Sequence, residues 1–307
     1  MKRLLATSLL VVLAALALHA AGTLDVYFIN VGHGDAILID FGERECLIDF
    51  GGPARYCPEL SQSSQGCGGS CLGCHGDLLL RLVDGDLELA ILSHNHWDHY
   101  GGFVNLLDVL QGAEKVLDQL WQGPDRGADT EGRYWGEFEA AVAAAGLDQP
   151  VDESGSLPPP IHPNLTWTLL SPSEVYQAEE NDNRNSLVLL LTFGNVSFLF
   201  TGDIQTPTES TLSATTPLAG TVVLKVAHHG SHTSTSVPFL EWADPELAII
   251  SGDKDDLHEN TRSALGRHGV PFLQTSGNGT ICVSTNGIAV WVTTDMVSGD
   301  SFGCSED

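Results

Sequence analysis

The chain has 307 residues, of which 42% are apolar and 17% charged, a composition typical of globular proteins. Its 13 basic and 40 acidic side chains give a formal net charge of −27, which excludes a wide basic surface for tracking nucleic-acid phosphates. Any contact with nucleic acid would be local, and charge alone predicts no stable nucleic-acid binding. The 33 glycines and 14 prolines form no repeat, which argues against collagen-like and repeat architectures.

The first 21 residues have the layout of a secretory signal peptide. Met1-Lys2-Arg3 is basic, residues 4–18 are apolar apart from Thr7 and Ser8, and residues 20–22 are small. The apolar run is short for a bilayer span, and an uncleaved anchor is the alternative. Cleavage takes the formal charge to −29, because it removes two basic residues and no acid. We then expect residues 22–307 to form a single secreted or periplasmic domain without a further membrane segment.

Seven cysteines in an exported chain favour disulfides. Four of them lie between Cys57 and Cys74, inside a Gly- and Ser-rich loop at residues 53–77, and four cysteines can pair in three ways. The segment Cys71-Leu-Gly-Cys74-His75 also matches the attachment pattern of c-type haem. A disulfide-stapled loop, a structural zinc site and a haem site therefore all stay open. Because the total is odd, at least one thiol is unpaired or intermolecular.

Apolar runs separated by turn residues predict strands and helices in alternation. The first half predicts strands at residues 24–30, 35–41, 45–50 and 87–93 and helices at 102–111 and 135–146. The second half predicts strands at 167–170, 186–193, 196–201, 224–227 and 247–251, helices at 239–243 and 260–268, and a closing hairpin of strands at 280–284 and 288–293. Several strands followed by helices, twice over, predict an α/β (α+β) fold in which two sheets pack together with helices outside.

The strongest chemical signal directly follows the strand at 87–93. Four potential metal ligands stand there within six residues: His94, His96, Asp98 and His99. Imidazole and carboxylate together suit Zn²⁺, with Mn²⁺ or Fe²⁺ as alternatives. In an extended loop, alternation sends His94 and His96 one way and Asp98 the other, and His99 can join Asp98. This arrangement can fill two adjacent metal sites.

Two later strands also end in ligand-type residues. Asp203 follows the apolar strand at 196–201, and His228 with His229 follows the strand at 224–227. Asp49 stands at the end of the strand at 45–50 in the same way. Because each of these residues follows a buried strand at the corresponding end, we expect Asp203 and His228 to lie next to the His-rich loop. We expect Asp49 to hydrogen-bond a ligand histidine and so to orient it.

These motifs resemble the metallo-β-lactamase-fold hydrolases. More closely, the segments NVGHGDA from Asn30, NRNSL from Asn183, TGD from Thr201 and HHGS from His228 are similar to the hydrolase domain of the ComEC-like DNA-uptake proteins. They are also similar to the phosphorylcholine esterases of Gram-positive surfaces. The resemblance extends from about residue 24 to 294 and implies an αββα sandwich with metals at one edge between the sheets.

By position, the resemblance implies one or two metal ions, Zn²⁺ with Mn²⁺ as the alternative. One ion would be held by His94 and His96, the other by Asp98, His99 and His228, with Asp203 bridging. The resemblance places a further histidine on a strand before the bridging aspartate, but this chain has NDNRN at 181–185. Asp182 is then a substitute ligand, or the first site is weak.

Other positions also depart from the family pattern. The family usually has Asp and Gln where this chain has Asn30 and His33, and we expect His33 to stabilise its loop or to touch substrate or metal. His162 follows three prolines and is expected at the surface. His258 occupies the position of a phosphate-contacting histidine in the ComEC-like group, but Glu259 stands where proline normally follows, so helix capping is the alternative.

Metals at such a site lower the pKa of water and polarise the electrophile. The resulting hydroxide would attack phosphorus or carbonyl carbon, with Asp98 or Asp203 orienting it or accepting its proton. The residues expected to stabilise developing charge or to lie around the substrate are His229, Ser231, Ser234 and Asn185.

The sequence therefore predicts a secreted, metal-dependent phosphodiesterase. A nuclease acting on extracellular DNA and an enzyme for a smaller phosphodiester, such as a choline-phosphate decoration, both fit the motifs. The negative charge weakens the DNA version, because protein and polyanion repel each other. A β-lactamase fits less well, since the resemblance lies with phosphodiester enzymes. The alternative from a different class is a non-catalytic metal- or haem-binding secreted protein.

Overall fold

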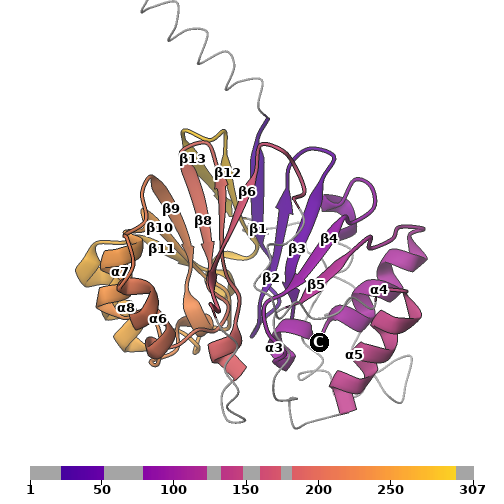
Figure 1. Ribbon diagram of the computed structural model, residues 1–307, viewed down its shortest axis with the longest axis horizontal. Helices are drawn as coiled ribbons and strands as arrows, with labels where there is room; N and C mark the ends of the chain where they lie inside the picture. Colours follow the sequence, from indigo (N-terminus) through magenta and orange to yellow (C-terminus); the bar gives the residue numbers. More distant parts are fainter. Residues whose placement is uncertain (1–21, 52–78, 123–132, 148–159, 174–181, 295–307) are drawn as a thin grey trace, which may run out of the picture.

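The computed structural model describes residues 22–51, 79–122, 133–147, 160–173 and 182–294. These residues form two β-sheets packed face to face, with helices on both outer faces (Figure 1). The αββα sandwich predicted from the sequence is confirmed. The proposed signal peptide at 1–21 and the Cys-rich loop at 53–77 lie outside the described residues. In the described part of the chain, no helix is long and apolar enough to cross a membrane.

The first sheet has seven strands in the order β13-β12-β1-β2-β3-β4-β5. They are β1 (Leu24–Phe28), β2 (Ala36–Asp40), β3 (Glu45–Phe50), β4 (Leu89–Leu92), β5 (Leu120–Gln122), β12 (Ile281–Thr285) and β13 (Val290–Thr294). Strands β1 to β3 are antiparallel, whereas β3, β4 and β5 run parallel. The chain therefore returns from β4 to β5 through α3 (Trp97–Tyr100) and α4 (Phe103–Gly112), and α5 (Arg133–Ala144) packs on α4.

The second sheet has six strands in the order β11-β10-β9-β8-β7-β6. They are β6 (Thr166–Ser171), β7 (Val188–Phe193), β8 (Val196–Phe200), β9 (Thr221–Lys225), β10 (Leu247–Ile250) and β11 (Phe272–Gln274). Its helices are α6 (Thr206–Ser213), α7 (Val237–Ala243), α8 (Glu259–His268) and α9 (Thr275–Asn278), with 3₁₀ turns η2 (Asp182–Asn185) and η3 (Ala227–Gly230). Because β8 to β11 are parallel, their carboxyl ends lie at the same edge of the sheet.

Apolar side chains fill three layers. Ile37 and Ile39 of β2 point into the layer between the sheets, where they join residues such as Phe198 of the second sheet. The alternate residues Ala36 and Leu38 point outward and pack under α4 and α5. A third layer lies between the second sheet and helices α6 to α8. Strands buried on both faces explain why the sequence shows continuous apolar runs in place of clean alternation.

The cysteines in the described part of the chain are not cross-linked. Cys46 and Cys282 are free thiols there, the first of them buried. The crowded cysteines from Cys57 to Cys74, together with Cys304, lie outside the described residues. The disulfides expected from the sequence are therefore found for neither Cys46 nor Cys282.

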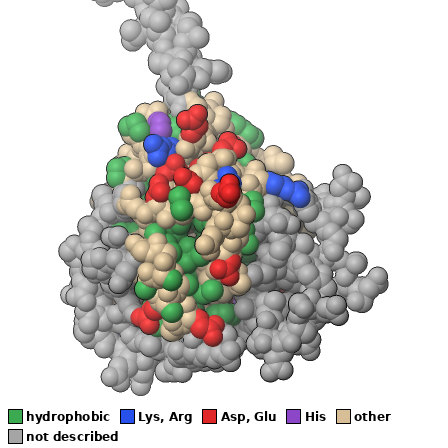
Figure 2. Space-filling model, turned by 90° about the vertical axis from the view of Figure 1, so that its right-hand side faces the viewer, with side chains coloured by type: hydrophobic (Ala, Val, Ile, Leu, Met, Phe, Trp, Pro, Cys, Tyr) green, Lys and Arg blue, Asp and Glu red, His purple; other side chains and the backbone are tan. Residues whose placement is uncertain are grey.

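The described part of the face that carries α4 and α5 is acidic in character. Figure 2 shows carboxylates scattered over this face and no continuous patch of Lys or Arg among its described residues. This distribution agrees with the net charge of −27. Like charges on such a surface repel one another, so buried carboxylates here carry a cost beyond their own desolvation.

Glu45 at the start of β3 is a buried carboxylate. It is 1% exposed, its Oε1 accepts a hydrogen bond from Asp84 N at 3.2 Å, and its Oε2 has no hydrogen-bond partner. Burial, together with the nearby charge of Glu88, raises the pKa of Glu45 from 4.5 to about 7. Because the folded-state pKa lies above the unfolded one, the neutral acid stabilises the fold at low pH. This stability is lost as pH rises from about 4.5 through about 7.

We predict that Glu45→Gln raises the melting temperature at pH 8 by about 2–4 °C, equivalent to about 1 kcal/mol, and leaves it nearly unchanged at pH 5. The amide stays neutral at both pH values and can still accept the hydrogen bond from Asp84 N. Thermal melts followed by circular dichroism measure the difference. The exposed neighbour Glu43→Gln removes the same formal charge and serves as the control. An equal rise in both variants would contradict the role of burial.

Candidate metal centre

Several strand ends meet at one edge of the sandwich, at the bottom of Figure 1. Asp49 stands near the end of β3, and α3, which follows β4, carries Asp98 and His99. Asp203 follows β8, and His229 lies in η3 after β9. The parallel strands of both sheets thus deliver residues from four separate parts of the chain to one place.

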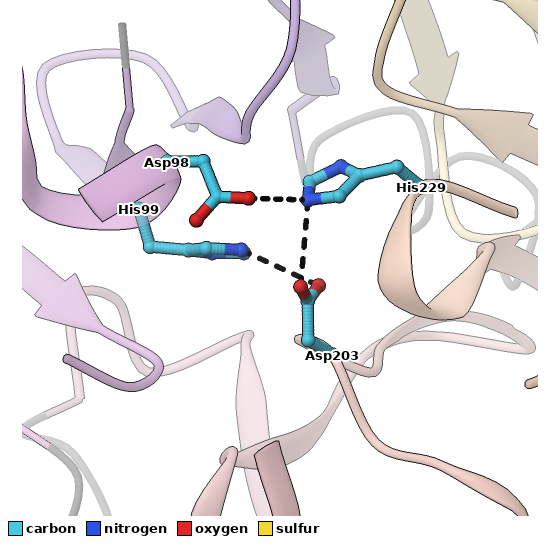
Figure 3. Close-up of side chains that lie close together, drawn as sticks. All are labelled: Asp98, His99, Asp203 and His229. Atoms are coloured by element: carbon cyan, nitrogen blue, oxygen red, sulfur yellow. Dashed lines mark ion pairs between the residues drawn. The ribbon is translucent and has the colours of Figure 1, made fainter. Parts of the chain in front are cut away.

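Asp98, His99, Asp203 and His229 form a compact cluster whose ligand atoms all lie within 4.8 Å of one another (Figure 3). His229 Nε2 lies 3.2 Å from Asp98 Oδ2 and 3.4 Å from Asp203 Oδ2. His99 Nε2 lies 3.3 Å from Asp203 Oδ1. Two ligands of a tetrahedral ion with bonds of about 2.0–2.1 Å lie about 3.3–3.4 Å apart, so these spacings suit a zinc-sized cation.

The cluster also contains buried polar atoms without hydrogen-bond partners. They are His99 Nε2, Asp203 Oδ1 and His229 Nε2. A buried polar atom left unpaired costs free energy, so a folded protein rarely leaves three of them together. A divalent cation among these atoms would satisfy all three at once. The donor set therefore fits a divalent metal.

Asp49 holds His99 from behind. Its Oδ2 accepts a hydrogen bond from His99 Nδ1 at 2.7 Å, and its two oxygens accept from Ser93 N and Ser93 Oγ, each at 2.7 Å. With the proton on Nδ1, the Nε2 lone pair of His99 faces the cluster, as metal coordination requires. Asp49 has a left-handed backbone with φ of 57°, a strained conformation that is typical of functional sites.

Two glycines let α3 approach the first sheet. The carbonyl oxygen of Asp98 accepts a hydrogen bond from Asp35 N at 3.1 Å. A Cβ atom at Gly51 would lie 1.6 Å from this oxygen, and one at Gly34 would lie 2.4 Å from it. Neither position can carry a side chain without displacing Asp98.

Lys225 and Asp35 form a buried ion pair next to the cluster. The Lys225 ammonium contacts Asp35 Oδ2, lies 3.7 Å from Asp203 Oδ1 and donates to Gly202 O at 3.1 Å. Asp35 Oδ1 in turn lies 3.8 Å from His229 Nδ1. Sequence analysis missed both residues. The available signal was a lysine within the otherwise apolar run before His228, since a buried lysine requires a partner.

The charges of the cluster support one another. Burial favours the protonated form of Asp203, but His229 and His99 outweigh this effect and hold the pKa of Asp203 well below its usual value. Burial lowers the pKa of His94, outside the cluster, well below its usual value. In the cluster, burial opposes protonation, but Asp203 outweighs it and raises the pKa of His229 to about 10 and that of His99 well above its usual value. Both imidazoles would therefore give up a proton when a metal binds. An ionised carboxylate and a neutral imidazole are the forms that bind metal.

His94, His96 and His228, which the sequence analysis expected among the ligands, lie outside the compact cluster. His94 Nε2 is buried, lacks a hydrogen-bond partner and lies 4.0 Å from Asp203 Oδ2. The rings of His94 and His96 pack against each other at 4.7 Å. Among the described residues, no group of three ligand atoms within 4.8 Å includes any of these histidines. The side chain of Asp182, the suggested substitute ligand, lies outside the described part.

The structure exchanges the places expected for His228 and His229. His229 is 1% exposed and belongs to the cluster, whereas His228 Nε2 lies 3.9 Å from Asp203 Oδ2 and its side chain is 27% exposed. Both residues have left-handed backbones, with φ of 52° and 53°. This turn directs the second imidazole inward and leaves the first near the surface. Neighbouring histidines cannot be told apart from sequence when such a turn decides between them.

His33 lies at the edge of the cluster. Its Nε2 is 3.1 Å from Asp98 Oδ2, and its Nδ1 donates to Asp256 Oδ2 at 2.9 Å. The hydrogen bond to Asp256, followed by the one to Asp98, raises the pKa of His33 to about 9. Asp256, which the sequence analysis did not single out, comes from the loop after β10.

Of the other expected site residues, Ser234 and His258 are not members of the cluster. Ser234 Oγ donates to Ile204 O at 2.8 Å. His258 is exposed and caps α8, accepting a hydrogen bond from Asn260 N at 3.1 Å, so the structure shows the capping alternative. His162 packs on Phe41 with ring centroids 4.4 Å apart and the rings tilted by 50°, at the opposite end of β2 from Asp35.

Two further expected residues lie close to the cluster without joining it. Asn185 is buried in η2, and the adjacent Ser186 Oγ accepts a hydrogen bond from Asp203 N at 3.1 Å. Ser231 Oγ lies 3.1 Å from Thr233 Oγ1, which is 3.4 Å from His228 Nδ1. These contacts position the backbone and rings around the centre.

Comparison with known proteins gives the family. A family model for the metallo-beta-lactamase superfamily matches residues 25–252. The chain belongs to the metallo-beta-lactamase superfamily. The crystal structure of the metallo-beta-lactamase fold protein YhfI from Bacillus subtilis covers 88% of this chain and 100% of its own, with a TM-score of 0.50 and 13% sequence identity. That likeness supports the fold alone.

Curated relatives include ComEC-like competence proteins, as the motifs predicted. ComE operon protein 3 of Bacillus subtilis (strain 168) is 28% identical over 267 residues, which are 84% of this chain and 32% of the relative. Recombination protein 2 of Haemophilus influenzae is 31% identical over 232 residues, or 76% of this chain and 24% of the relative. The chain therefore spans a third or less of these relatives. Family and donor set together make this a metal-dependent hydrolase that uses a divalent ion.

We predict that His229→Ala lowers the affinity for Zn²⁺ by more than about a hundredfold, because it removes a ligand from the buried cluster. Asp49→Asn should cost about 10–100-fold, as expected for a residue that orients a ligand histidine. Competition with a chromophoric chelator measures both affinities. His228→Ala is the matched comparison and should cost less than His229→Ala. A larger loss of Zn²⁺ affinity in His228→Ala than in His229→Ala would mean that His228 is the ligand.

Proposed function

We propose that this protein is a secreted phosphodiesterase that uses Zn²⁺, with Mn²⁺ as the alternative ion. The observation that carries the proposal is the cluster of Asp98, His99, Asp203 and His229 at the edge of the sandwich. A divalent ion bound there acidifies water and stabilises negative charge on a phosphoryl oxygen. The residues of the chain orient the ligands, orient the attacking water and accept its proton.

The side chains of the cluster have separate parts in this proposal. Asp203 has one oxygen toward His99 and the other toward His229, so it fixes the positions of the two imidazoles relative to each other. Asp49 keeps the proton of His99 on Nδ1. The side chain of Asp98 is 19% exposed, against 1% for Asp203, so Asp98 is the carboxylate placed to orient water or accept its proton.

The choice of a phosphodiester rests on the relatives. The names of curated relatives refer to recombination and to competence, and these relatives align over most of this chain. Their similarity supports a phosphodiester bond over a lactam. The net charge of −27 favours a small phosphodiester or a locally held strand over extended contact with duplex DNA, because the acidic surface repels a polyanion.

We predict that the metal-loaded protein hydrolyses bis-p-nitrophenyl phosphate, that chelator abolishes the activity, and that Asp203→Asn lowers kcat/KM by at least about a hundredfold. Linear DNA, plasmid DNA and nitrocefin are assayed in parallel to separate nuclease, small-diester and lactam activities. His268→Ala, on α8 away from the cluster, is the control. Bound metal without chelator-sensitive phosphodiesterase activity would reject the proposal, and preferential cleavage of nitrocefin would replace it.

We also propose export through the N-terminal segment. Residues 1–21 have a basic start, an apolar run and small residues at the junction, which are the features of a cleaved signal. When the full chain is expressed in a bacterial host, we expect the protein in the periplasm or medium, with an N-terminus near Gly22. Intact mass spectrometry checks this. A cell-associated protein that keeps residues 1–21 would contradict the proposal.

A further inference from the structure

The metal centre is closed on most sides. The side chains of His99, Asp203 and His229 are at most 2% exposed, whereas those of Asp98 and His33 are 19% and 33% exposed. Among the described residues, one approach to the cluster therefore passes Asp98 and His33, and the partly exposed His228 lies beside Asp203. A substrate that reaches the ion along this route must come close to the His33 imidazole.

The His33 ring faces this approach. Its Nε2 lies 3.1 Å from Asp98 Oδ2, the same oxygen that lies 3.2 Å from His229 Nε2. The rings of His33 and His229 are 4.8 Å apart. An atom in contact with a ligand oxygen is one contact away from the ion itself. His33 Nε2 is therefore close enough to touch a group that the ion binds.

Asp256 fixes the direction of the His33 ring. His33 Nδ1 donates to Asp256 Oδ2 at 2.9 Å, and the same oxygen accepts from Asp253 N at 2.5 Å. His33 stands in the loop between β1 and β2 of the first sheet, whereas Asp256 stands after β10 of the second. The contact thus ties a loop of each sheet across the edge and directs His33 Nε2 toward Asp98 Oδ2.

We propose that His33, held by Asp256, donates its Nε2–H to a non-bridging oxygen of the substrate phosphodiester beside the ion. The inference rests on the proposed phosphodiesterase function and deepens it by naming a residue that binds the scissile phosphate. If Asp98 Oδ2 held the ion, the His33 N–H would be available to a second acceptor, and a phosphate oxygen is a strong one. His33 is then a substrate-binding residue, and Asp256 is the positioning residue behind it.

The test uses His33→Ala, His33→Gln and Asp256→Asn, with His268→Ala as the control. Zn²⁺ content is measured first, and the affinity of the zinc-loaded protein for inorganic phosphate is then measured by calorimetry. KM and kcat for bis-p-nitrophenyl phosphate follow. Loss of a hydrogen bond to a charged group should weaken phosphate binding and raise KM in His33→Ala by about tenfold or more, with metal content unchanged.

The conservative variants separate binding from a merely structural role. His33→Gln keeps an N–H donor of similar reach and should recover most of the phosphate affinity lost in His33→Ala. Asp256→Asn should cost less than His33→Ala, and the double variant His33→Ala/Asp256→Asn should bind phosphate no more weakly than His33→Ala alone. Additive losses in the double variant would overturn the inference, because they would mean that Asp256 does not act through His33.

Failure of this inference differs from failure of the proposed function. If the wild-type protein hydrolyses bis-p-nitrophenyl phosphate and His33→Ala leaves KM and phosphate affinity unchanged, the function stands and the inference falls. Loss of zinc from His33→Ala would also overturn it, because His33 would then support the metal and not the substrate. A different result would be that the wild-type protein hydrolyses no phosphodiester, yet His33→Ala binds phosphate more weakly than the wild-type protein does. The phosphate site would then stand and the proposed function would fall.

Discussion

Negative charge buried between the two sheets is the constraint on which the rest of this structure depends. Asp35, Asp49 and Asp203 are at most 2% exposed, and a buried carboxylate is stable only when it is paired and hydrogen-bonded. The ammonium of Lys225 compensates Asp35 directly and Asp203 at 3.7 Å, and His99 donates to Asp49. Asp203 Oδ1 and the facing imidazole nitrogens have no hydrogen-bond partner, and a divalent cation would satisfy them together.

The architecture explains why this charge gathers at one edge. Parallel strands end on the same side of a sheet, and the last residues before each crossover there are free of the ladder. Strands β8 and β9 run side by side, so Asp203 and His229 are neighbours in space although 26 positions separate them in the chain. Helices α4 to α8 lie on the outer faces, whereas the short helix α3 lies at this edge (Figure 1). A site between the sheets is thus a consequence of the topology.

The sequence predicted secondary structure best where a continuous apolar run was bounded by turn residues. Strand β3 lies at Glu45–Phe50, as predicted, because a continuous apolar run there is bounded by turn residues. Helix α6 was not predicted, since its sequence TPTESTLS is polar and only a few of its residues are buried. Strand β9 was predicted at 224–227 but ends at Lys225, because the chain then enters the left-handed turn at His228. The same turn decides which histidine enters the cluster, and no periodicity encodes it.

The distances from Asp203 to the surrounding histidines show how this chain compares with the ligand set that the family resemblance implies. Its Oδ1 faces His99 and its Oδ2 faces His229 at 3.4 Å, while His94 and His228 stand 4.0 and 3.9 Å from that same Oδ2. The ligand set formed with His99 and His229 is therefore compact, and His94 and His228 lie at longer distances from the oxygen that also faces His229. The segment 181–185 lacks the histidine that the family resemblance places there. Among the described residues, the compact cluster around Asp203 suits one ion, whereas His94 and His228 lie farther from the same carboxylate oxygen.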